Sequence, residues 1–586
     1  MATESFFSNA SLAYLASAGA GKDGKTYSIK PTDGTGDFTF SRGSNLAATR
    51  VGADGLIEKG RENLLLRSNT FNTSPWFVTG IDTPTSGQSG YDGLSDAWIL
   101  EKNGAFAYLY QDKSISGVQT FSFYGKAGTL PQVRITINTS VVNVTAAFDL
   151  ANGIDLGSSQ NITSSIESVG NGWYRCSVTY NQGTTSRFRI YPADVGGDLS
   201  GTSGNIYIQD AQVELGLVAT DYIESGASTG KAGLLEDEPR FDYSGGATCP
   251  SLLLEPSRTN LVTQSEYFGG SDWTNSGTSV VSGFTSPEGL SNAYKLVEDS
   301  ANLTHFINSS EITTPDTTYS SSVYIKANGR NKVAFRENSF TGNYASFNLS
   351  DGTLIETNGV SASIESASNG WYRINYQVTS GNNYIVGIYL LSDSYTSGDP
   401  FSNSYQGDGT SGAYIYGAQL ESGSYPTSYI PNHSGGSVTR GADDSLSNTN
   451  FSSIFGASSL TQYTIFLEVL KAVDSGTSTT LINKGTNDQG RVNYLGGDRL
   501  VYYSTATGYT TGNNITDGNP HKYLLSADNG TIKQFFDGVL IDTNTNALDE
   551  LTNINIGGDD KNLNISQFLI FPEALSDADC ITLTTL

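Results

Sequence analysis

The chain has 586 residues, and its 58 Asp and Glu outnumber its 32 Lys and Arg, so its formal net charge is −26. Such an acidic chain is disfavoured as a binder of nucleic acid or of an anionic membrane surface, because both partners are recognised through basic patches. A composition with 33 Tyr, 26 Phe, 66 Gly and only 15% charged residues is typical of a folded, β-rich protein and argues against disorder.

Cysteines, histidines and apolar runs exclude further classes of protein. No CxxC pair is present, and the odd set of Cys176, Cys249 and Cys580 predicts reduced thiols rather than a zinc or redox motif. The 3 histidines leave little material for a catalytic triad or a histidine metal site. No apolar run reaches the roughly 18 residues of a membrane span, so we expect no membrane insertion. The N-terminus lacks a basic region before Lys22, which predicts mature sequence rather than a signal peptide.

Residues 1–59 contain turns and short strand-like stretches but too little apolar material for a core of their own. We expect such a segment to pair with another chain or to pack onto the unit that follows it. The prediction is an N-terminal segment that attaches the chain to a virus particle or drives oligomerisation.

An internal repeat follows this segment. Residues 60–226 and 255–432 share sequence blocks in the same order, at an offset of roughly 200 residues. Matched blocks include RENLLLRSNTFNTSPW with RTNLVTQSEYFGGSDW, IESVGNGWYR with IESASNGWYR, and IQDAQVELG with IYGAQLESG. The blocks predict two units with one fold, joined by a connector over 227–254.

Each unit alternates apolar and polar residues over short stretches such as YRCSVTY and YRINYQV. Many short strands without helical periodicity predict an antiparallel sandwich of jelly-roll type. The aromatic residues at matching places are predicted to be structural: Trp76 with Trp273, and Trp173 with Trp371. The shared Arg175 and Arg373 are predicted to pair with Glu167 and Glu365.

Residues 433–586 have a different sequence pattern from the two repeat units. The stretch QYTIFLEVL (462–470) opens a third β region, and residues 517–542 read as three strands joined by turns. The last stretch predicts a strand and then a short helix capped by Ser576. This region is long enough for a second kind of sandwich.

The candidates for function are residues that differ between the two units. Unit two carries an insertion at 392–412 that is rich in Tyr, Asp and Asn, where unit one has a shorter loop. Sugar binding needs a flat aromatic face for the apolar side of the ring and carboxylates or amides for the hydroxyls. The candidate glycan-binding residues are Tyr395, Asp399, Tyr405, Asp408, Trp98, Asp194 and Asp198. The alternative is a solvated polar loop.

Signals for metal binding and catalysis are weaker. Asp559 and Asp560 are candidates for a Ca²⁺ site, with an Asp-rich turn as the alternative, and no other cofactor is predicted. No GxSxG, HExxH or P-loop pattern is present, and a catalytic carboxylate pair cannot be chosen among 58 acidic residues without geometry. We expect a protein that is not an enzyme, with a polysaccharide depolymerase as the lesser alternative.

Several blocks resemble structural proteins of tailed bacteriophages, of the tail-fibre or head-fibre type. They are FSRGSNLAATRVGADGLIE (40–58), PRFDYSGGATCPSLLLEPSRTNL (239–261), GAQLESGSYPTSYIP (417–431), SVTRGAD (437–443) and FLIFPEALSDADC (568–580). The repeat units resemble jelly-roll carbohydrate-binding modules, and residues 433–586 resemble concanavalin A-like, laminin-G-like lectin domains. With the strand patterns, the resemblance implies an all-β fold class: tandem antiparallel jelly-roll sandwiches plus a concanavalin A-like sandwich.

The function that this resemblance implies is a fibre on the virion surface, assembled in the host cytoplasm. Such a fibre would attach to host surface glycans through several weak sites, whose combined avidity exceeds each single affinity. The expected partners are other virion structural proteins and host glycans, in a homo-oligomer with a trimer favoured, and without nucleic acid. A purely structural capsid or tail decoration protein is the alternative.

Overall fold

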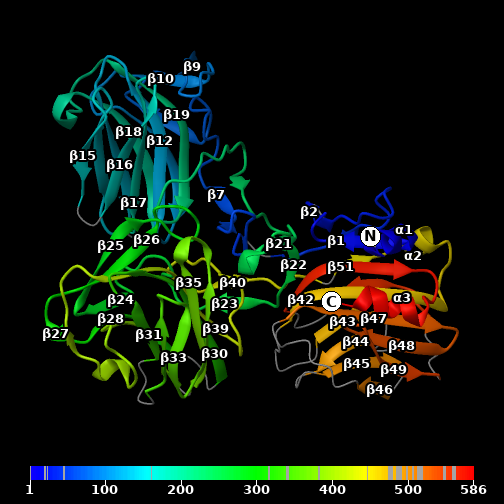
Figure 1. Ribbon diagram of the computed structural model, residues 1–586. Helices are drawn as coiled ribbons and strands as arrows, with labels where there is room; N and C mark the ends of the chain where they lie inside the picture. Colours follow the sequence, from blue (N-terminus) through cyan, green and yellow to red (C-terminus); the bar gives the residue numbers. More distant parts are fainter. Residues whose placement is uncertain are drawn as a thin grey trace.

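The computed structural model shows a chain that is almost entirely β-stranded and is arranged in three bodies (Figure 1). It describes residues 2–18, 21–22, 24–43, 46–159, 162–181, 183–313, 317–337, 342–380, 383–444, 446–472, 479–483, 491–495, 499–504, 507–510, 519–545, 550–556 and 562–585. The predicted all-β class of antiparallel sandwiches is confirmed. The helices among these residues are α1 (Ala2–Asn9), α2 (Phe451–Phe455) and α3 (Asp577–Thr584), and none is long and apolar enough to cross a membrane.

Module one is a sandwich of two six-stranded antiparallel sheets. The first sheet has the order β16 (Thr163–Gly170), β17 (Trp173–Tyr180), β12 (Gln119–Ala127), β19 (Asn205–Leu215), β10 (Ala97–Glu101), β9 (Thr85–Gln88). The second has the order β15 (Ile154–Ser158), β14 (Val144–Asp149), β13 (Gln132–Thr139), β18 (Thr185–Ala193), β11 (Tyr108–Ile115), β8 (Trp76–Thr79). Alternation sets the two faces, since Cys176 and Val178 of β17 lie in the core whereas Arg175 and Ser177 lie on the outer side.

Module two has the same two sheets in the same strand order, as the repeat predicts. The first is β34 (Ser361–Ser366), β35 (Tyr372–Ser380), β30 (Thr317–Asn328), β39 (Gly412–Ser422), β26 (Ala293–Glu298), β25 (Thr278–Phe284). The second is β33 (Thr353–Asn358), β32 (Tyr344–Asn348), β31 (Lys332–Glu337), β37 (Val386–Leu391), β28 (His305–Ser309), β24 (Trp273–Ser276).

Both modules share a β-bulge at one place in the first sheet. The register shifts between Ser122 and Tyr124 in module one and between Ser322 and Tyr324 in module two. In strands β19 and β39 a left-handed residue lies at this place, namely Asp210 (φ 52°) in module one and Gly417 (φ 62°) in module two. Glycine adopts this conformation freely and aspartate tolerates it, so two different residues give the same backbone.

The third body is a sandwich of an eight-stranded and a nine-stranded sheet. The first contains β21 (Arg240–Asp242), β22 (Ser251–Leu254), β51 (Leu563–Phe571), β42 (Gln462–Ala472), β47 (His521–Asp528), β48 (Thr531–Phe536), β49 (Val539–Asn544) and, beside β51, β1 (Leu12–Leu15). The second has the order β2 (Gly21–Lys22), β3 (Lys25–Thr26), β4 (Phe38–Thr39), β41 (Leu446–Asn448), β50 (Ile554–Ile556), β43 (Thr479–Asn483), β44 (Arg491–Leu495), β45 (Arg499–Ser504), β46 (Thr507–Thr510).

Short two-stranded ladders complete the fold. They are β5 (Thr49–Val51) with β6 (Ile57–Lys59), β7 (Arg61–Asn63) with β20 (Gly230–Ala232), β23 (Arg258–Asn260) with β40 (Val438–Arg440), β27 (Asn302–Leu303) with β38 (Tyr405–Gln406), and β29 (Ile312–Thr313) with β36 (Asn383–Tyr384).

Residues 10–40 of the N-terminal segment belong to the third body, whereas residues 49–59 pack against module two, where Ile57 is buried with Tyr324 and Trp371. This corrects the expectation that the segment packs onto unit one. Strand β1 pairs with β51 near the C-terminus, and β4 pairs with β41, so the two chain ends lie in the same body (Figure 1). Leu12, Tyr14 and Phe38 are fully buried in the core of this sandwich. The segment has too few apolar residues for a core of its own, but these residues complete a core that lies more than 400 positions away in sequence.

The connector between the modules also contributes to this sandwich. Strand β22 pairs with β51, and Leu252 and Leu254 are fully buried in the same core as Leu12. The third body is therefore built from three separate stretches of chain, and the two modules are inserted between those stretches. Helices α1 and α3 lie on its outer side, where Phe6, Phe7 and Leu583 pack together with the buried Cys580.

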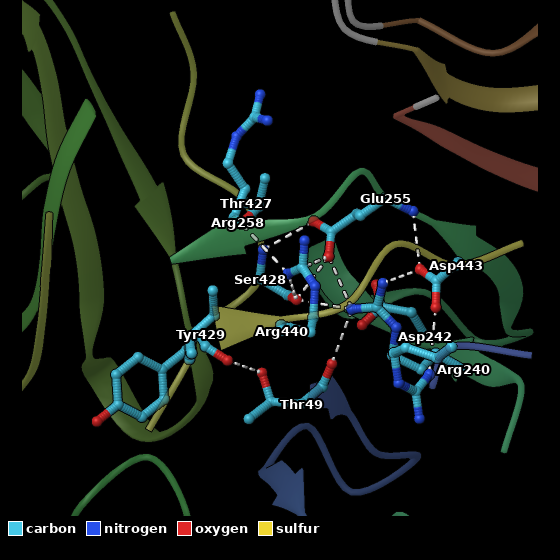
Figure 2. Close-up of polar contacts among 12 residues, drawn as sticks. Thr49, Arg240, Asp242, Glu255, Arg258, Thr427, Ser428, Tyr429, Arg440 and Asp443 are labelled. Atoms are coloured by element: carbon cyan, nitrogen blue, oxygen red, sulfur yellow. Dashed lines mark hydrogen bonds and ion pairs between the residues drawn. The ribbon is translucent and has the colours of Figure 1, made fainter. Parts of the chain in front are cut away.

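A buried network of charges lies where these stretches meet (Figure 2). Arg240 forms ion pairs with Glu255, at 2.7 Å, and with Asp443, and Arg440 pairs with Glu255 at 2.8 Å. Arg42 of the N-terminal segment reaches Asp443 at 3.2 Å. All five residues are buried, so each charge depends on its partners in place of water.

Neutral groups add hydrogen bonds to this network. Ser428 donates to Glu255 through its hydroxyl, at 2.6 Å, and through its backbone N–H, at 2.7 Å. The carbonyl of Thr49 accepts from Arg240 at 3.2 Å (Figure 2). Burial alone would raise the pKa of Glu255, but Arg440 and Arg240 hold this pKa well below its ordinary value. The stability that comes from this group is therefore present at neutral pH and is lost as the pH falls into the acid range.

We predict that Asp443→Ala lowers the free energy of unfolding by roughly 3–5 kcal/mol, because it leaves Arg42 and Arg240 buried without their shared carboxylate. The measurement is urea-induced unfolding, with limited proteolysis to detect release of the N-terminal segment. Asp393→Ala is the control, since its pair with Arg330 is 55% exposed on the Asp side and should contribute less than about 1 kcal/mol. Equal, small losses in both variants would contradict a structural role for the network.

Candidate functional site

The chain carries a cleft between the two modules with a volume of about 480 Å³. One wall is the outer face of the first sheet of module one, and the other wall comes from the edge of module two around Tyr267 and Tyr294. The two walls are held together because Leu217 packs against the core of module two and the N–H of Val118 donates to the carbonyl of His433 at 3.0 Å. The cleft is therefore a defined feature of the arrangement of the modules.

Hydroxyl groups cover most of the module-one wall. The alternation of β16 and β17 sends small polar residues to this side, and they form cross-strand pairs. The hydroxyls of Ser165 and Ser177 lie 2.7 Å apart, and the hydroxyl of Thr179 lies 2.8 Å from that of Thr120, which is buried on β12 behind the wall. A hydroxyl both donates and accepts, so this wall offers hydrogen bonds of either polarity.

A carboxylate and a guanidinium stand side by side on the same wall. Glu167 lies directly opposite Arg175 in the β16–β17 register, and both line the cleft. Arg175 donates to the hydroxyl of Ser122 at 3.2 Å and to the carbonyl of Thr220, and its guanidinium lies 5.4 Å from the centre of the Tyr124 ring. Among the described residues Arg175 does not form the ion pair with Glu167 that the repeat predicts, so Glu167 faces the cleft without this partner.

Aromatic rings form part of the opposite wall. The rings of Tyr267 and Tyr294 lie 6.4 Å apart in an edge-on arrangement, and burial raises the pKa of both hydroxyls. Tyr267 is half-buried, so part of its ring is open to the cleft. The site thus combines hydroxyls, one charge of each sign and an aromatic surface, which are the groups expected of a polyol site.

Module two carries the equivalent Glu365 and Arg373 opposite each other in β34 and β35. Both line other cavities, of about 260 and 680 Å³, which are bordered by residues 49–57 of the N-terminal segment and by the connector around Ser244. The same pair of side chains therefore faces a different neighbour in each module.

A buried carboxyl group, that of Asp210, lies at one end of the module-one wall. Tyr91 stacks on Tyr124 at 3.9 Å and donates to Asp210 at 2.9 Å. Burial raises the pKa of Asp210 to about 7, and the neighbouring Asp96 and Asp92 also raise it, whereas the hydrogen bond from Tyr91 lowers it. The carboxyl therefore gains a proton at a much higher pH than an exposed aspartate does.

We predict that Asp210→Asn stabilises module one more at pH 8 than at pH 5. The folded-state pKa of about 7 lies above the value of about 3.9 expected in the unfolded chain, so the stability contributed by the protonated carboxyl is lost as the pH rises toward 7. Asparagine keeps the hydrogen bond from Tyr91 and tolerates a positive φ. Scanning calorimetry should show a rise of about 2–4 °C in the module-one transition at pH 8.

The control for this prediction is Asp221→Asn, which removes one exposed carboxylate from the same module. It should leave the difference between pH 5 and pH 8 unchanged. The raised pKa of Asp210 would be contradicted if the unfolding temperature of wild-type module one did not decrease, relative to that of Asp210→Asn, between pH 5 and pH 8.

The insertion of module two, which contains four of the predicted glycan-binding residues, is folded against its own sheet. Tyr395 is only 4% exposed, and its hydroxyl donates to Glu356 at 2.6 Å. Asp399 accepts from the N–H of Phe401 and pairs with Arg336 at 3.1 Å. Both residues are used to pack and cap the insertion, because this loop is long enough to fold back over the sheet, and they do not form an exposed sugar platform.

Tyr405 and Asp408 are brought together, but around an internal carboxylate. The hydroxyl of Tyr405 and the N–H of Asp408 both donate to Glu298, each at 2.8 Å. The carboxylate of Asp408 accepts hydrogen bonds from Ser411 and Thr410, which hold its pKa below the ordinary value. These contacts close the end of the insertion.

The candidates of module one are also engaged locally. Trp98 lies in the core, where its indole N–H donates to the carbonyl of Asn69 at 3.2 Å. Asp194 caps the 3₁₀ turn η1 (Val195–Gly197), and Asp198 accepts from Ser200 two residues later. The structure thus places Asp194 and Asp198 in one loop but does not assemble the seven candidates into one site.

The predicted structural tryptophans are all buried, although not in one place. Trp76 and Trp273 lie in the main cores of the two modules. Trp173 and Trp371 lie instead in smaller clusters on the outer side of the first sheets, with Tyr124 and Tyr324 respectively. Asp559 and Asp560 fall outside the described residues, and the described ranges contain no group of three or more His, Cys, Asp or Glu arranged to hold a metal ion.

Glu167 and Arg175 are the site residues that the sequence analysis treated as structural. Their presence in both units suggested an internal ion pair. The available signal was the run of Ser and Thr around them, since a strand face covered with hydroxyls is poorly suited to a core.

Comparison with known proteins yields no matching family model and no matching curated protein. Similar solved structures include the CBM40 module of Ruminococcus gnavus IT-sialidase bound to α2,3-sialyllactose, mouse laminin α1 domains LG4-5, and Trypanosoma rangeli sialidase in complex with sialic acid. Their identities to this chain are 18%, 11% and 10%, with TM-scores of 0.19, 0.15 and 0.20. The alignments cover 22%, 54% and 93% of this chain and 84%, 91% and 97% of those chains. At these scores the likeness carries no inference about a ligand.

Proposed function

We propose that this protein binds carbohydrate in the cleft between its two modules. The observation that carries the proposal is the composition of the module-one wall, where paired hydroxyls surround Glu167 and Arg175 and face the ring of Tyr267. Sugar hydroxyls exchange hydrogen bonds with such groups, and the apolar face of a sugar ring packs on a tyrosine ring. The volume of about 480 Å³ lies within the usual range of ligand sites and suits a short oligosaccharide.

The proposal extends to the role of the whole chain. A fibre on a bacteriophage virion, attached to other structural proteins and displaying several such clefts in a homotrimer, would bind host surface glycans through avidity. The support for this part is the resemblance of the sequence blocks at 40–58, 239–261 and 437–443 to phage fibre proteins. In this role the protein binds its glycan and does not cleave it.

A purely structural decoration protein is the second candidate, and one observation favours it. The blocks that carry the resemblance supply Arg42, Arg240, Glu255, Arg440 and Asp443, which form the buried junction network. These blocks therefore encode how the three bodies are joined, and a scaffold needs nothing more. Binding measurements separate the two candidates.

The proposal predicts that Glu167→Gln weakens glycan binding, because it replaces a charged hydrogen-bond acceptor by a neutral one. Loss of a hydrogen bond to a charged group costs roughly 1.5–3 kcal/mol, which corresponds to about a tenfold to hundredfold rise in Kd. The measurement is binding of the full-length protein to a glycan panel, followed by calorimetric titration with the best ligand found.

The repeat supplies a matched control, Glu365→Gln, which makes the same change at the same strand position of module two. It should leave the affinity unchanged, since Glu365 does not line the intermodular cleft but lies beside the N-terminal segment and the connector. Equal weakening by both variants would place the site elsewhere, and absence of binding by the wild-type oligomer would favour the structural decoration role.

A further inference from the structure

The two modules differ on the outer face of their second sheets. In module two the insertion at 392–411 folds over this face, so that Tyr395 packs with Ala334, Tyr389 and Leu391 in one buried cluster. Tyr389 and Ala334 alternate with core residues along β37 and β31, which places them on the outer side of the sheet. The insertion thus occupies a sheet face that would otherwise be open.

The insertion contacts this face through an acidic and an aromatic residue. The carboxylate of Asp399 pairs with Arg336 at 3.1 Å, and the guanidinium of Arg336 lies 5.3 Å from the centre of the Phe401 ring. Below them, the rings of Phe306 and Tyr389 stack at 4.8 Å. An aromatic pair with an adjacent arginine therefore receives a carboxylate and a ring from a peptide segment.

Module one presents a similar surface without such a cover. The strand registers place Tyr108 where module two has Phe306, and Tyr191 where it has Tyr389. The two tyrosine rings lie 4.9 Å apart, close to the 4.8 Å of the pair in module two. The corresponding loop, residues 194–204, is shorter and is tied to the ends of the sheet instead, where its Gly197 N–H donates to Gln132 at 2.9 Å.

Arginines accompany the aromatic pair in module one as well. The guanidinium of Arg189 lies 5.1 Å from the centre of the Tyr108 ring, and that of Arg187 lies 4.3 Å from the Tyr110 ring. Arg187 is paired with Asp112 at the edge of this surface. Within the described residues neither Arg189 nor Arg134, which lies opposite Tyr191 in the register, forms an ion pair with a carboxylate.

The surface is unusual for this chain in both charge and polarity. Three arginines, Arg134, Arg187 and Arg189, lie on two adjacent strands of a protein whose net charge is −26. Beside them Phe77 packs on Tyr110 at 5.4 Å and is still 47% exposed. Such a combination leaves positive charge and apolar surface available to a partner with the opposite charge and rings of its own.

We infer that the surface formed by Phe77, Tyr108, Tyr110, Arg134, Arg189 and Tyr191 is a docking site for an acidic, aromatic segment of a partner protein. The occupant has the chemistry of Asp399-Pro400-Phe401, which fills the equivalent face of module two from within the same chain. Its carboxylate pairs with Arg189 or Arg134, and its ring packs on the half-buried Tyr108, beside Tyr191, which is itself only 8% exposed. This site is separate from the intermodular cleft, which lies on the first sheet of the module.

The test uses full-length protein and a fluorescently labelled peptide with the sequence of residues 392–411, followed by anisotropy. We expect saturable binding that weakens about tenfold or more in Arg189→Gln, because a charge-assisted hydrogen bond is removed. A peptide carrying Asp399→Asn and Phe401→Ala should bind equally weakly. The matched control Lys533→Gln removes a partly exposed cation from the third body and should leave the affinity unchanged.

A second variant distinguishes loss of the docking site from loss of the folded structure. Replacing residues 194–204 by residues 392–411 should cover the face from within and abolish peptide binding, while the Glu167-dependent glycan binding of the cleft persists. The inference would be overturned if the peptide still bound to Arg189→Gln and to the loop-replacement variant. It would also be overturned if Lys533→Gln weakened peptide binding as much as Arg189→Gln does. Binding of an oligogalacturonate in an Arg189-dependent manner, without binding of the peptide, would also overturn it by identifying an acidic glycan as the occupant.

Discussion

The arrangement of this protein depends on the buried charge network around Arg240 and Asp443. Two carboxylates and three guanidiniums are buried there, and the ion pairs between them replace the lost hydration. The partners come from the N-terminal segment, the connector and the stretch after module two, so the network is complete only when all of these meet. It therefore ties the two inserted modules to a sandwich whose own strands come from distant parts of the chain.

The two modules show how one scaffold acquires different surfaces through its neighbours. Both carry a glutamate and an arginine opposite each other on the first sheet, yet one pair faces a cleft against module two and the other faces the N-terminal segment and connector. Both also carry an aromatic pair on the second sheet, but only in module two does a loop of the same chain cover it. In such repeats the function of a module depends on which of its sheet faces other parts of the chain cover and which remain accessible to a partner.

The polar insertion of module two illustrates the limit of reading a loop by composition. Tyrosines and aspartates suit a sugar site, and the same residues suit a loop that folds back on its sheet, where Tyr395 reaches Glu356 and Asp399 reaches Arg336. Whether the loop forms a sugar site or packs on its sheet depends on whether the sheet offers partners for these side chains. The partners, Glu356 and Arg336, lie about 40 to 60 positions away in sequence. The opposite holds for Glu167 and Arg175, whose repetition suggested a structural pair but whose surroundings make them the wall of a cleft.

The all-β class, the repeat and the strand-rich units could be predicted from the amino-acid sequence, because alternation and turn residues are local signals and the two units share them in one order. The sequence also marked the four buried tryptophans, since bulky aromatic residues at matching strand positions are seldom exposed. Three features became visible in the folded chain alone: residues 12–39 complete the C-terminal sandwich, the cleft lies between the modules, and a loop covers the aromatic pair of module two but not that of module one. These features depend on contacts between segments that are up to several hundred residues apart, and no local pattern specifies which buried carboxylate will meet which arginine.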